Sequence, residues 1–257
     1  MNYWVKNSID LASKPGYLDN IYNVYPMEVG DIRQFPKELR NKIKLACEAG
    51  DKLDLIKLLL NNLDLFPIKD SYIAFLRRNK GALDINPGTV ERIGGRLLNM
   101  GFNEIIKASS QPKETNRQIG PLFHRWIPKL GYPVLSEQDF LNHKGVAFLE
   151  GSDTYLKDFS NKYLKTKLKK GLDLLLKVKS KYIIGEAKFL TDFGGHQNAQ
   201  FNDAINLLHG KGGNAVRIAV LDGVLWIKGN NKMHNYIKKE KGAAMSALLL
   251  ENFIKKF

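Results

Sequence analysis

One stretch of the chain constrains its fold more than any other. Residues Gly171–Leu190 read GLDLLLKVKSKYIIGEAKFL, two apolar segments joined by a short basic turn. This pattern is typical of a β-hairpin. Side chains alternate between the two faces of a strand, so each segment has one apolar face and one face that carries ionisable groups near its outer end. The stretch therefore predicts two neighbouring antiparallel strands with mostly apolar side chains, and with ionisable side chains at one place on one face.

Three ionisable residues make that interruption: Asp173, Glu186 and Lys188. A two-residue turn at Lys179-Ser180 places Asp173 opposite Glu186, and a turn at Ser180-Lys181 places it opposite Lys188. In either register the three groups share one face, within about 5–8 Å of each other at Cβ. A three-residue loop would place them on opposite faces unless a β-bulge restored the match.

Two carboxylates this close repel each other and favour a compensating cation. Oxygen ligands suit Mg²⁺ or Mn²⁺, and such an ion can lower the pKa of a bound water and stabilise charge on a phosphodiester. Lys188 beside it would orient or help deprotonate the attacking water and neutralise the transition state. The alternative is a partly exposed Asp173–Lys188 ion pair with a solvated Glu186, which contributes little to stability.

Charge and composition narrow the class of partner. The chain has 40 Lys and Arg against 26 Asp and Glu, a formal net charge of +14, which indicates a polyanionic partner such as nucleic acid or, alternatively, a lysine-rich surface. Cys47 is the only cysteine, so an internal disulfide is excluded. We expect no membrane span and no signal peptide, hence a cytoplasmic protein. No GxxxxGK[ST] motif is present, so we expect no nucleotide cofactor.

Helical and strand patterns divide the chain. Apolar residues at helical spacing dominate the first 130 residues, and strands alternate with helices after about residue 145. This order predicts an α/β fold, a mixed central β-sheet flanked by helices, with a mainly helical N-terminal half. We expect helices within residues 36–50, 51–66, 70–79, 86–101, 117–131, 152–171, 194–213 and 242–257, a strand at 146–151, and two strands around the turn Asp222-Gly223 within 214–231.

The motif G-L-D(173)–x12–E(186)-A-K(188) resembles that of the PD-(D/E)xK nucleases, and especially that of the type II restriction endonucleases. Leu172 departs from the pattern, since the family often has proline there. The resemblance covers about residues 150–226. It implies that Asp173, Glu186 and the Ala187 carbonyl ligate Mg²⁺, with Mn²⁺ as a substitute, and that Lys188 assists the water nucleophile.

The resemblance also implies a further acid before the Asp173 strand. The candidates are Glu150, Asp153 and Asp158, of which Glu150 is preferred. Together with the change of pattern near residue 145, it predicts a restriction-endonuclease-like core at 145–257; the helical pattern before that point predicts a helical subdomain at 1–144, within one nuclease domain spanning 1–257. The expected activity is cleavage of double-stranded DNA at a short specific sequence by a homodimer, because two active sites are needed to cut both strands. The alternatives are a junction resolvase or repair nuclease of the same fold and a DNA-binding protein without catalytic activity.

Two polar segments are candidates for contacts with bases, which Asn, Gln and Arg side chains typically read. One follows the Glu186 strand and the other precedes the helix expected at 117–131; the alternatives are a polar helix N-terminus and a solvated connector. The candidates are His196, Gln197, Asn198, Gln200 and Asn202 in the first segment, and Lys113, Arg117 and Gln118 in the second. Lysines between residues 157 and 170 are candidates for phosphate contacts, which position DNA without reading its sequence.

Overall fold

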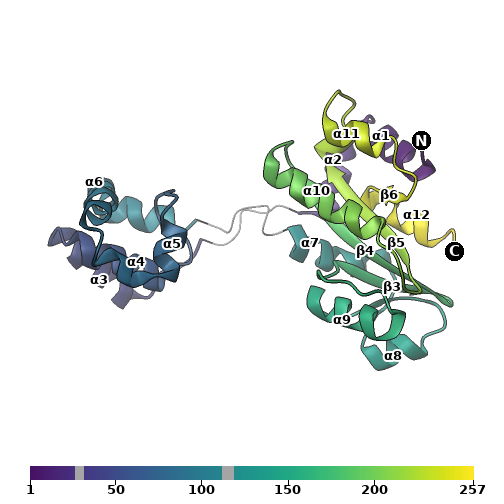
Figure 1. Cartoon of the computed structure of the whole chain (residues 1–257), viewed down its shortest axis with the longest axis horizontal. Coiled ribbons are helices and arrows are strands. Elements are labelled where there is room, and N and C mark those ends of the chain that lie inside the picture. Colours follow the sequence, from purple (N-terminus) through teal and green to yellow (C-terminus); the bar gives the residue numbers. More distant parts are fainter. Residues whose placement is uncertain (27–31, 112–118) are drawn as a thin grey trace. The chain divides into compact units, whose positions relative to one another are not determined.

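The computed structural model describes residues 1–26, 32–111 and 119–257. The chain divides into two compact units, one made of Met1–Met27 with Glu114–Phe257 and the other of Glu28–Lys113 (Figure 1). We call them the sheet unit and the helical unit. The helical unit is thus inserted into the sequence of the sheet unit, and the expected boundary at residue 144 does not coincide with this division. Helical periodicity alone gives no sign of which helices pack on a sheet and which pack on one another.

Within the described residues, six strands form one mixed sheet in the order β1-β2-β3-β4-β5-β6. Neighbouring strands are parallel except in the pairs β2–β3 and β3–β4, which are antiparallel. The strands are β1 Val134–Leu135, β2 Val146–Leu149, β3 Leu174–Val178, β4 Lys181–Leu190, β5 Val216–Gly223 and β6 Ala243–Met245. The α/β class with a mixed, helix-flanked sheet is therefore confirmed.

The predicted hairpin is β3 and β4, in the first of the two registers considered. Val178 pairs with Lys181, so the turn is Lys179-Ser180, and Leu174 pairs with Gly185 at the other end. The Asp173 N–H still donates to the Gly185 carbonyl, and the ladder then ends. β4 continues to Leu190, beyond its last pair with β3 at Gly185. From Glu186 onward, the edge of β4 that faces β3 therefore pairs with no further residue of β3.

Helices cover both faces of the sheet. One face, with Leu174 and Leu176 of β3, packs against residues of α2, α7 and α12. The opposite face, with Leu175 and Leu221, packs against residues of α8, α9, α10, α1 and α11. The helices of this unit are α1 Tyr3–Ala12, α2 Tyr17–Val24, α7 Ile119–Trp126, α8 Glu137–Asn142, α9 Asp153–Leu164, α10 Gly195–Leu208, α11 Lys232–Ile237 and α12 Leu250–Ile254.

The helical unit contains α3 Lys37–Glu48, α4 Lys52–Asn62, α5 Ile73–Arg78 and α6 Pro87–Ser109. Its core is built from the apolar stripes of these helices, with Leu55 and Ile93 fully buried. Gly94 allows α4 and α6 to approach each other, because a Cβ there would lie 2.4 Å from the Lys52 Cβ. The predicted helix at 86–101 continues to Ser109 across a kink at Gly101, whose φ is 74°.

Two predictions about the C-terminal part were wrong. The Asp222-Gly223 pair does not turn between two strands: β5 runs to Gly223 and is followed by a short 3-10 helix, Val224–Trp226. Asp222 is fully buried, and its carboxylate accepts hydrogen bonds from the Ser246 hydroxyl and the Ala247 N–H. Residues 242–257 are not one helix, because Ala243–Met245 first pairs with β5 as β6. Tertiary hydrogen bonds here override local turn and helix signals.

Candidate active site

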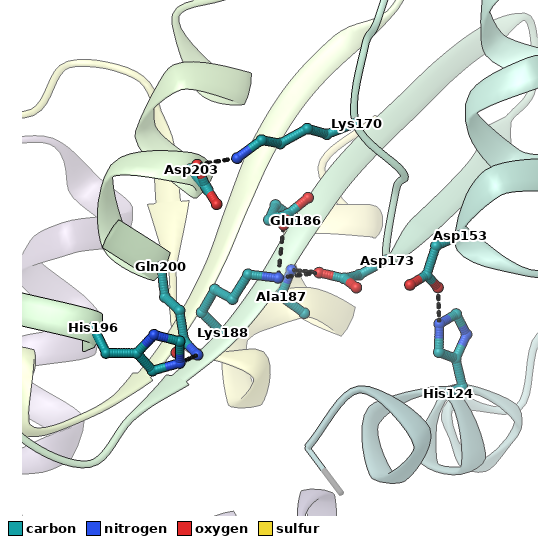
Figure 2. Close-up of polar contacts among 10 residues, drawn as sticks. All are labelled: His124, Asp153, Lys170, Asp173, Glu186, Ala187, Lys188, His196, Gln200 and Asp203. Carbon is teal, nitrogen blue, oxygen red and sulfur yellow. Dashed lines mark hydrogen bonds and ion pairs between the residues drawn. The ribbon is translucent and has the colours of Figure 1, made fainter. Parts of the chain in front are cut away.

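The hairpin brings the three predicted ionisable groups into direct contact. Lys188 Nζ lies 2.9 Å from Asp173 Oδ2 and 2.6 Å from Glu186 Oε1 (Figure 2). The side chains are only 11%, 13% and 21% exposed for Asp173, Glu186 and Lys188. The expectation that all three share one face of the strand pair is confirmed, and the group is a largely buried cluster rather than a solvated surface ion pair.

Asp173 lies directly before the first residue of β3, and the neighbouring strand fixes its position. Its Oδ2 accepts a hydrogen bond of 2.8 Å from the Ala187 N–H, at the edge of β4 where the ladder has stopped. The side-chain carboxylate therefore takes a bond that a backbone carbonyl would take in a longer strand. Ala187 itself packs into the core on the opposite face, which holds the neighbouring Glu186 and Lys188 toward the cluster.

The charges of the cluster do not balance, because it holds two carboxylates and one ammonium group. Burial and the charge of Asp173 raise the pKa of Glu186 to about 7, against the opposing effect of Lys188. Burial lowers the pKa of Lys188, but the charges of Asp173 and Glu186 outweigh it and raise that pKa above its usual value. One ammonium group compensates two carboxylates incompletely, so the site favours additional positive charge.

A second group of potential ligands adjoins the first. His124 belongs to α7, and Asp153 is the first residue of α9. His124 Nε2 lies 3.2 Å from Asp153 Oδ1 (Figure 2). One ligand atom each from His124, Asp153 and Asp173 lies within 4.8 Å of the others. The three residues line a cavity of about 350 Å³. No local signal could have joined His124 to this site, because it lies on a different helix far from the motif in sequence.

The preferred further acid, Glu150, lies elsewhere around the same cavity. It follows β2, is exposed, and lines the cavity without belonging to the His124–Asp153–Asp173 group. Asp153 lies nearer to Asp173 than expected, because the chain before Asp173 passes close to the start of α9. The Leu172 N–H donates to the Asp153 carbonyl at 3.0 Å, and a Cβ on Gly171 would lie 2.7 Å from the Asp153 Cβ.

The polar segment after β4 forms the start of α10. Gln197 is buried there, and its side-chain amide exchanges hydrogen bonds with Thr191. The amide therefore holds the loop after β4 and does not face solvent. Asn198 donates to the Phe193 carbonyl, and Gln200 is hydrogen-bonded to the exposed His196 (Figure 2). Asn202 is exposed. The other three candidates, Lys113, Arg117 and Gln118, lie outside the described residues.

A second, basic cavity of about 410 Å³ lies on the other side of Glu186. Glu186 and Asp203 are its acidic members, and Lys170 pairs with Asp203 at 2.6 Å. The remaining charged groups that line it are cationic: Lys167, Lys169, Lys211 and Arg217. A cationic wall beside the acidic cluster is suited to a phosphate chain that passes the site.

A mixed sheet with an Asp, a Glu and a Lys in contact across its central hairpin is the arrangement expected of a PD-(D/E)xK nuclease core, the class that the motif resembles. The chain belongs to the Tsp45I type II restriction enzyme family, whose sequence profile matches residues 2–257. It is therefore a restriction endonuclease, with DNA as its partner. No curated protein and no solved structure matches the chain. Among the described helices, none has the length and apolar character to cross a membrane.

Proposed function

We propose that this protein hydrolyses both strands of double-stranded DNA at a short specific sequence, with Mg²⁺ held by Asp173, Glu186 and the Ala187 carbonyl. The observation that carries the proposal is the contact of Lys188 with two largely buried carboxylates. An isolated structural ion pair would need only one acid. A second buried acid with a raised pKa is a cost that a catalytic cation offsets.

The residues present fit a hard divalent cation. The carboxylates of Asp173 and Glu186 and a backbone carbonyl at the free edge of β4 are oxygen donors, the kind that Mg²⁺ takes together with water and phosphate oxygens. When bound, the ion would lower the pKa of a water molecule and stabilise negative charge on the phosphodiester. Mn²⁺ prefers similar ligands and would substitute for it.

Lys188 acts in this proposal as a cation. Its pKa is raised, so the side chain is an ammonium group at neutral pH. An ammonium donates hydrogen bonds, so Lys188 would orient the attacking water and neutralise charge on the phosphoryl oxygens in the transition state. The raised pKa favours this role over direct removal of the proton of the water. Glu150, at the cavity wall, would contact that water from the other side.

The DNA would be held by the elements that flank the cluster. The basic cavity beside Glu186 would contact backbone phosphates through Lys167, Lys169 and Arg217. The start of α10 would contact base edges through His196, Asn198, Gln200 and Asn202, and we retain Lys113, Arg117 and Gln118 as further candidates. Gln197 would support this surface from beneath through its bonds to Thr191.

A homodimer would supply one active site for each strand. Twofold symmetry in the protein matches a DNA site that reads the same on both strands, and it allows both phosphodiester bonds to be cut in one complex. Sedimentation of the purified protein with and without its DNA site tests this point. A monomer in both conditions would contradict it.

Sequencing the ends of phage DNA digested with the purified protein and Mg²⁺ tests the central proposal. We expect discrete fragments whose ends share one short sequence, no cleavage in EDTA, and cleavage by Asp173→Asn that is slower by at least about 100-fold. Cleavage of only branched or damaged DNA would support the structure-specific alternative. DNA binding without metal-dependent nicking would support the non-catalytic one.

A further inference from the structure

One face of the helical unit collects arginine and aromatic side chains that its core does not use. It is formed by Tyr72, which directly precedes α5, by Phe75 of α5 and by Arg92 and Arg96 of α6 (Figure 1). We propose that this arginine face binds the sugar–phosphate backbone of double-stranded DNA, so that both units of the chain contact DNA. The inference rests on DNA being the partner and not on the proposed metal or cleavage chemistry.

The candidate active site leaves the helical unit without a role. The residues that line the two cavities beside Lys188 all belong to the sheet unit. The helical unit has a core of its own, with Leu55 and Ile93 fully buried, and its two ends meet where the Arg33 N–H donates to the Ser110 carbonyl at 3.0 Å. It is therefore a separately packed insertion, whose surface is available to a partner.

The segment that contains α5 is strongly cationic. From Lys69 to Lys80 it carries four Lys and Arg residues and one acid, Asp70. Lys69, Arg78 and Lys80 are exposed, and no carboxylate of the described residues pairs with them, because Asp70 is paired with the arginines of α6. DNA presents closely spaced phosphates, so surface cations of this density are suited to it.

A largely buried carboxylate holds the two arginines of the face. The Asp70 side chain is only 7% exposed, and it accepts hydrogen bonds from the guanidinium groups of Arg92 and Arg96. The Arg92 guanidinium also lies 5.1 Å from the centre of the Tyr72 ring, which is a cation–π contact. Each guanidinium has five N–H donors, and among the described residues only Asp70 accepts from them. The remaining donors of two fixed guanidinium groups are suited to phosphate oxygens.

Exposed aromatic rings adjoin these arginines. Tyr72 is 56% exposed and Phe75 is 60% exposed, and their spacing of three residues places both on one side of α5. Leaving rings of this size in water is unfavourable unless a partner covers them. Nucleic-acid-binding proteins combine such rings with arginine, using the ring for packing and the guanidinium for the phosphates. The composition of the face therefore fits DNA.

A second copy of the chain is the competing occupant of the arginine face. In a twofold dimer the same surface of both chains takes part, so the arginines of one copy would approach those of the other. Like charges at such an interface repel each other, whereas the phosphates of DNA carry the opposite charge. The charges therefore favour DNA over self-association at this face.

Photocross-linking of the full-length protein tests the placement. Phe75 is replaced by a benzophenone amino acid, and the protein is irradiated with a random-sequence DNA duplex in EDTA. Leu45 of α3, which is 65% exposed, is the matched control position in the same unit. We expect a protein–DNA adduct from position 75 and none from position 45. Equal adducts from both positions, or no DNA adduct from position 75 in protein that binds the duplex, would overturn the proposal. A protein–protein adduct in place of the DNA adduct would assign the face to self-association.

Arg96→Gln gives an independent measurement, because it removes one cation and leaves Asp70 paired with Arg92. If Arg96 contacts one phosphate, the slope of log K against log salt for the same duplex should become smaller by about 0.9. Lys44→Gln, on α3 where the lysine is paired with Glu48, should leave the slope unchanged. Circular dichroism melting curves show whether each variant is folded. An unchanged slope for folded Arg96→Gln would contradict the phosphate contact.

Both assays contain EDTA, so their results stand apart from the proposed cleavage activity. Failure of that activity would appear as DNA left intact after Mg²⁺ is added to protein that binds the duplex normally. Failure of the arginine face would appear as cleavage by protein that gives no DNA adduct from position 75.

Discussion

The Asp173 carboxylate is hydrogen-bonded to the Ala187 N–H at 2.8 Å, just before β3 begins and beyond its last pair with β4. The sheet itself therefore fixes one proposed metal ligand relative to two others, because Glu186 and Lys188 flank Ala187 on the same strand. A substitution that keeps a hydrogen-bond acceptor for the Ala187 N–H should leave this arrangement in place. Its substitutions should report on chemistry more than on folding.

Asp173→Asn should retain the fold and lose cleavage. Asparagine keeps an oxygen for the Ala187 N–H but lacks the negative charge that a divalent cation requires. We expect a fall in cleavage rate of at least about 100-fold, with DNA binding retained in a gel-shift assay. Asp158→Asn is the matched control, because Asp158 is an exposed acid of α9 paired with Lys157. Equal loss in both variants would count against a special role of Asp173.

Lys188→Met should lower the cleavage rate by about 10²–10³-fold while Mn²⁺ binding persists, because the change removes the transition-state donor and not a metal ligand. Single-turnover cleavage at saturating metal measures the chemical step. Lys181→Met is the control on the same strand, at the hairpin end, where the lysine is exposed. Unchanged cleavage by Lys188→Met would remove the amine from the mechanism.

Lys169→Ala should weaken DNA binding and reduce its salt dependence. If Lys169 of the basic cavity contacts one phosphate, the slope of log K against log salt should become smaller by about 0.9. Fluorescence anisotropy across a salt series measures this slope. Lys238→Ala, an exposed lysine of the same unit that does not line the cavity, should leave it unchanged. A smaller slope for Lys238→Ala, with the slope for Lys169→Ala unchanged, would show that the DNA does not contact the basic cavity.

Asp222 makes stability depend on pH. Burial raises its pKa to about 7, even though hydrogen bonds from Ser246, Ala247, Tyr25 and Tyr17 lower it. The folded state then holds a proton that the unfolded state releases near pH 4, so this contribution is full below about pH 4 and is lost as pH rises through 7.

Asp222→Asn should remove this dependence. Between pH 4 and 7 the free energy of unfolding of the unmodified protein should fall, relative to the variant, by up to about 1.4 kcal/mol per pH unit. Urea unfolding at a series of pH values measures the difference. Parallel curves for the two proteins would show that Asp222 stays ionised when folded.

Gly185→Ala should destabilise the sheet. A Cβ at this position of β4 would lie 2.8 Å from Ile218 Cγ1 and 3.0 Å from Leu174 Cδ2, both in the core. Overpacking of this kind costs about 1–3 kcal/mol. Gly195→Ala, where nothing lies within 4 Å of the added carbon, should be close to neutral. Chemical unfolding of the two variants compares them directly, and equal stability would show that the sheet adjusts without cost.

The sequence predicted the hairpin because a period of two, a short turn and three interrupting charges all occur within twenty residues of one another. It failed at Asp222-Gly223, where a strong turn signal was overruled by the Ser246 hydroxyl and other distant donors. It missed His124 because only tertiary folding brings α7 to the start of α9. It also missed that the first helices join the sheet, since their apolar stripes resemble those of the helical unit.

Helix α1 of the sheet unit is held by residues near the other end of the sequence. The Ser8 hydroxyl accepts a hydrogen bond from the Ser246 N–H, and the Asn2 amide donates to the Lys241 carbonyl, so helix α1 depends on residues that leave the ribosome more than two hundred positions later. The helical unit lies between them in the chain and can fold while synthesis is still under way. The sheet unit therefore cannot be completed until the segment 241–246 has been synthesised, well after the helical unit.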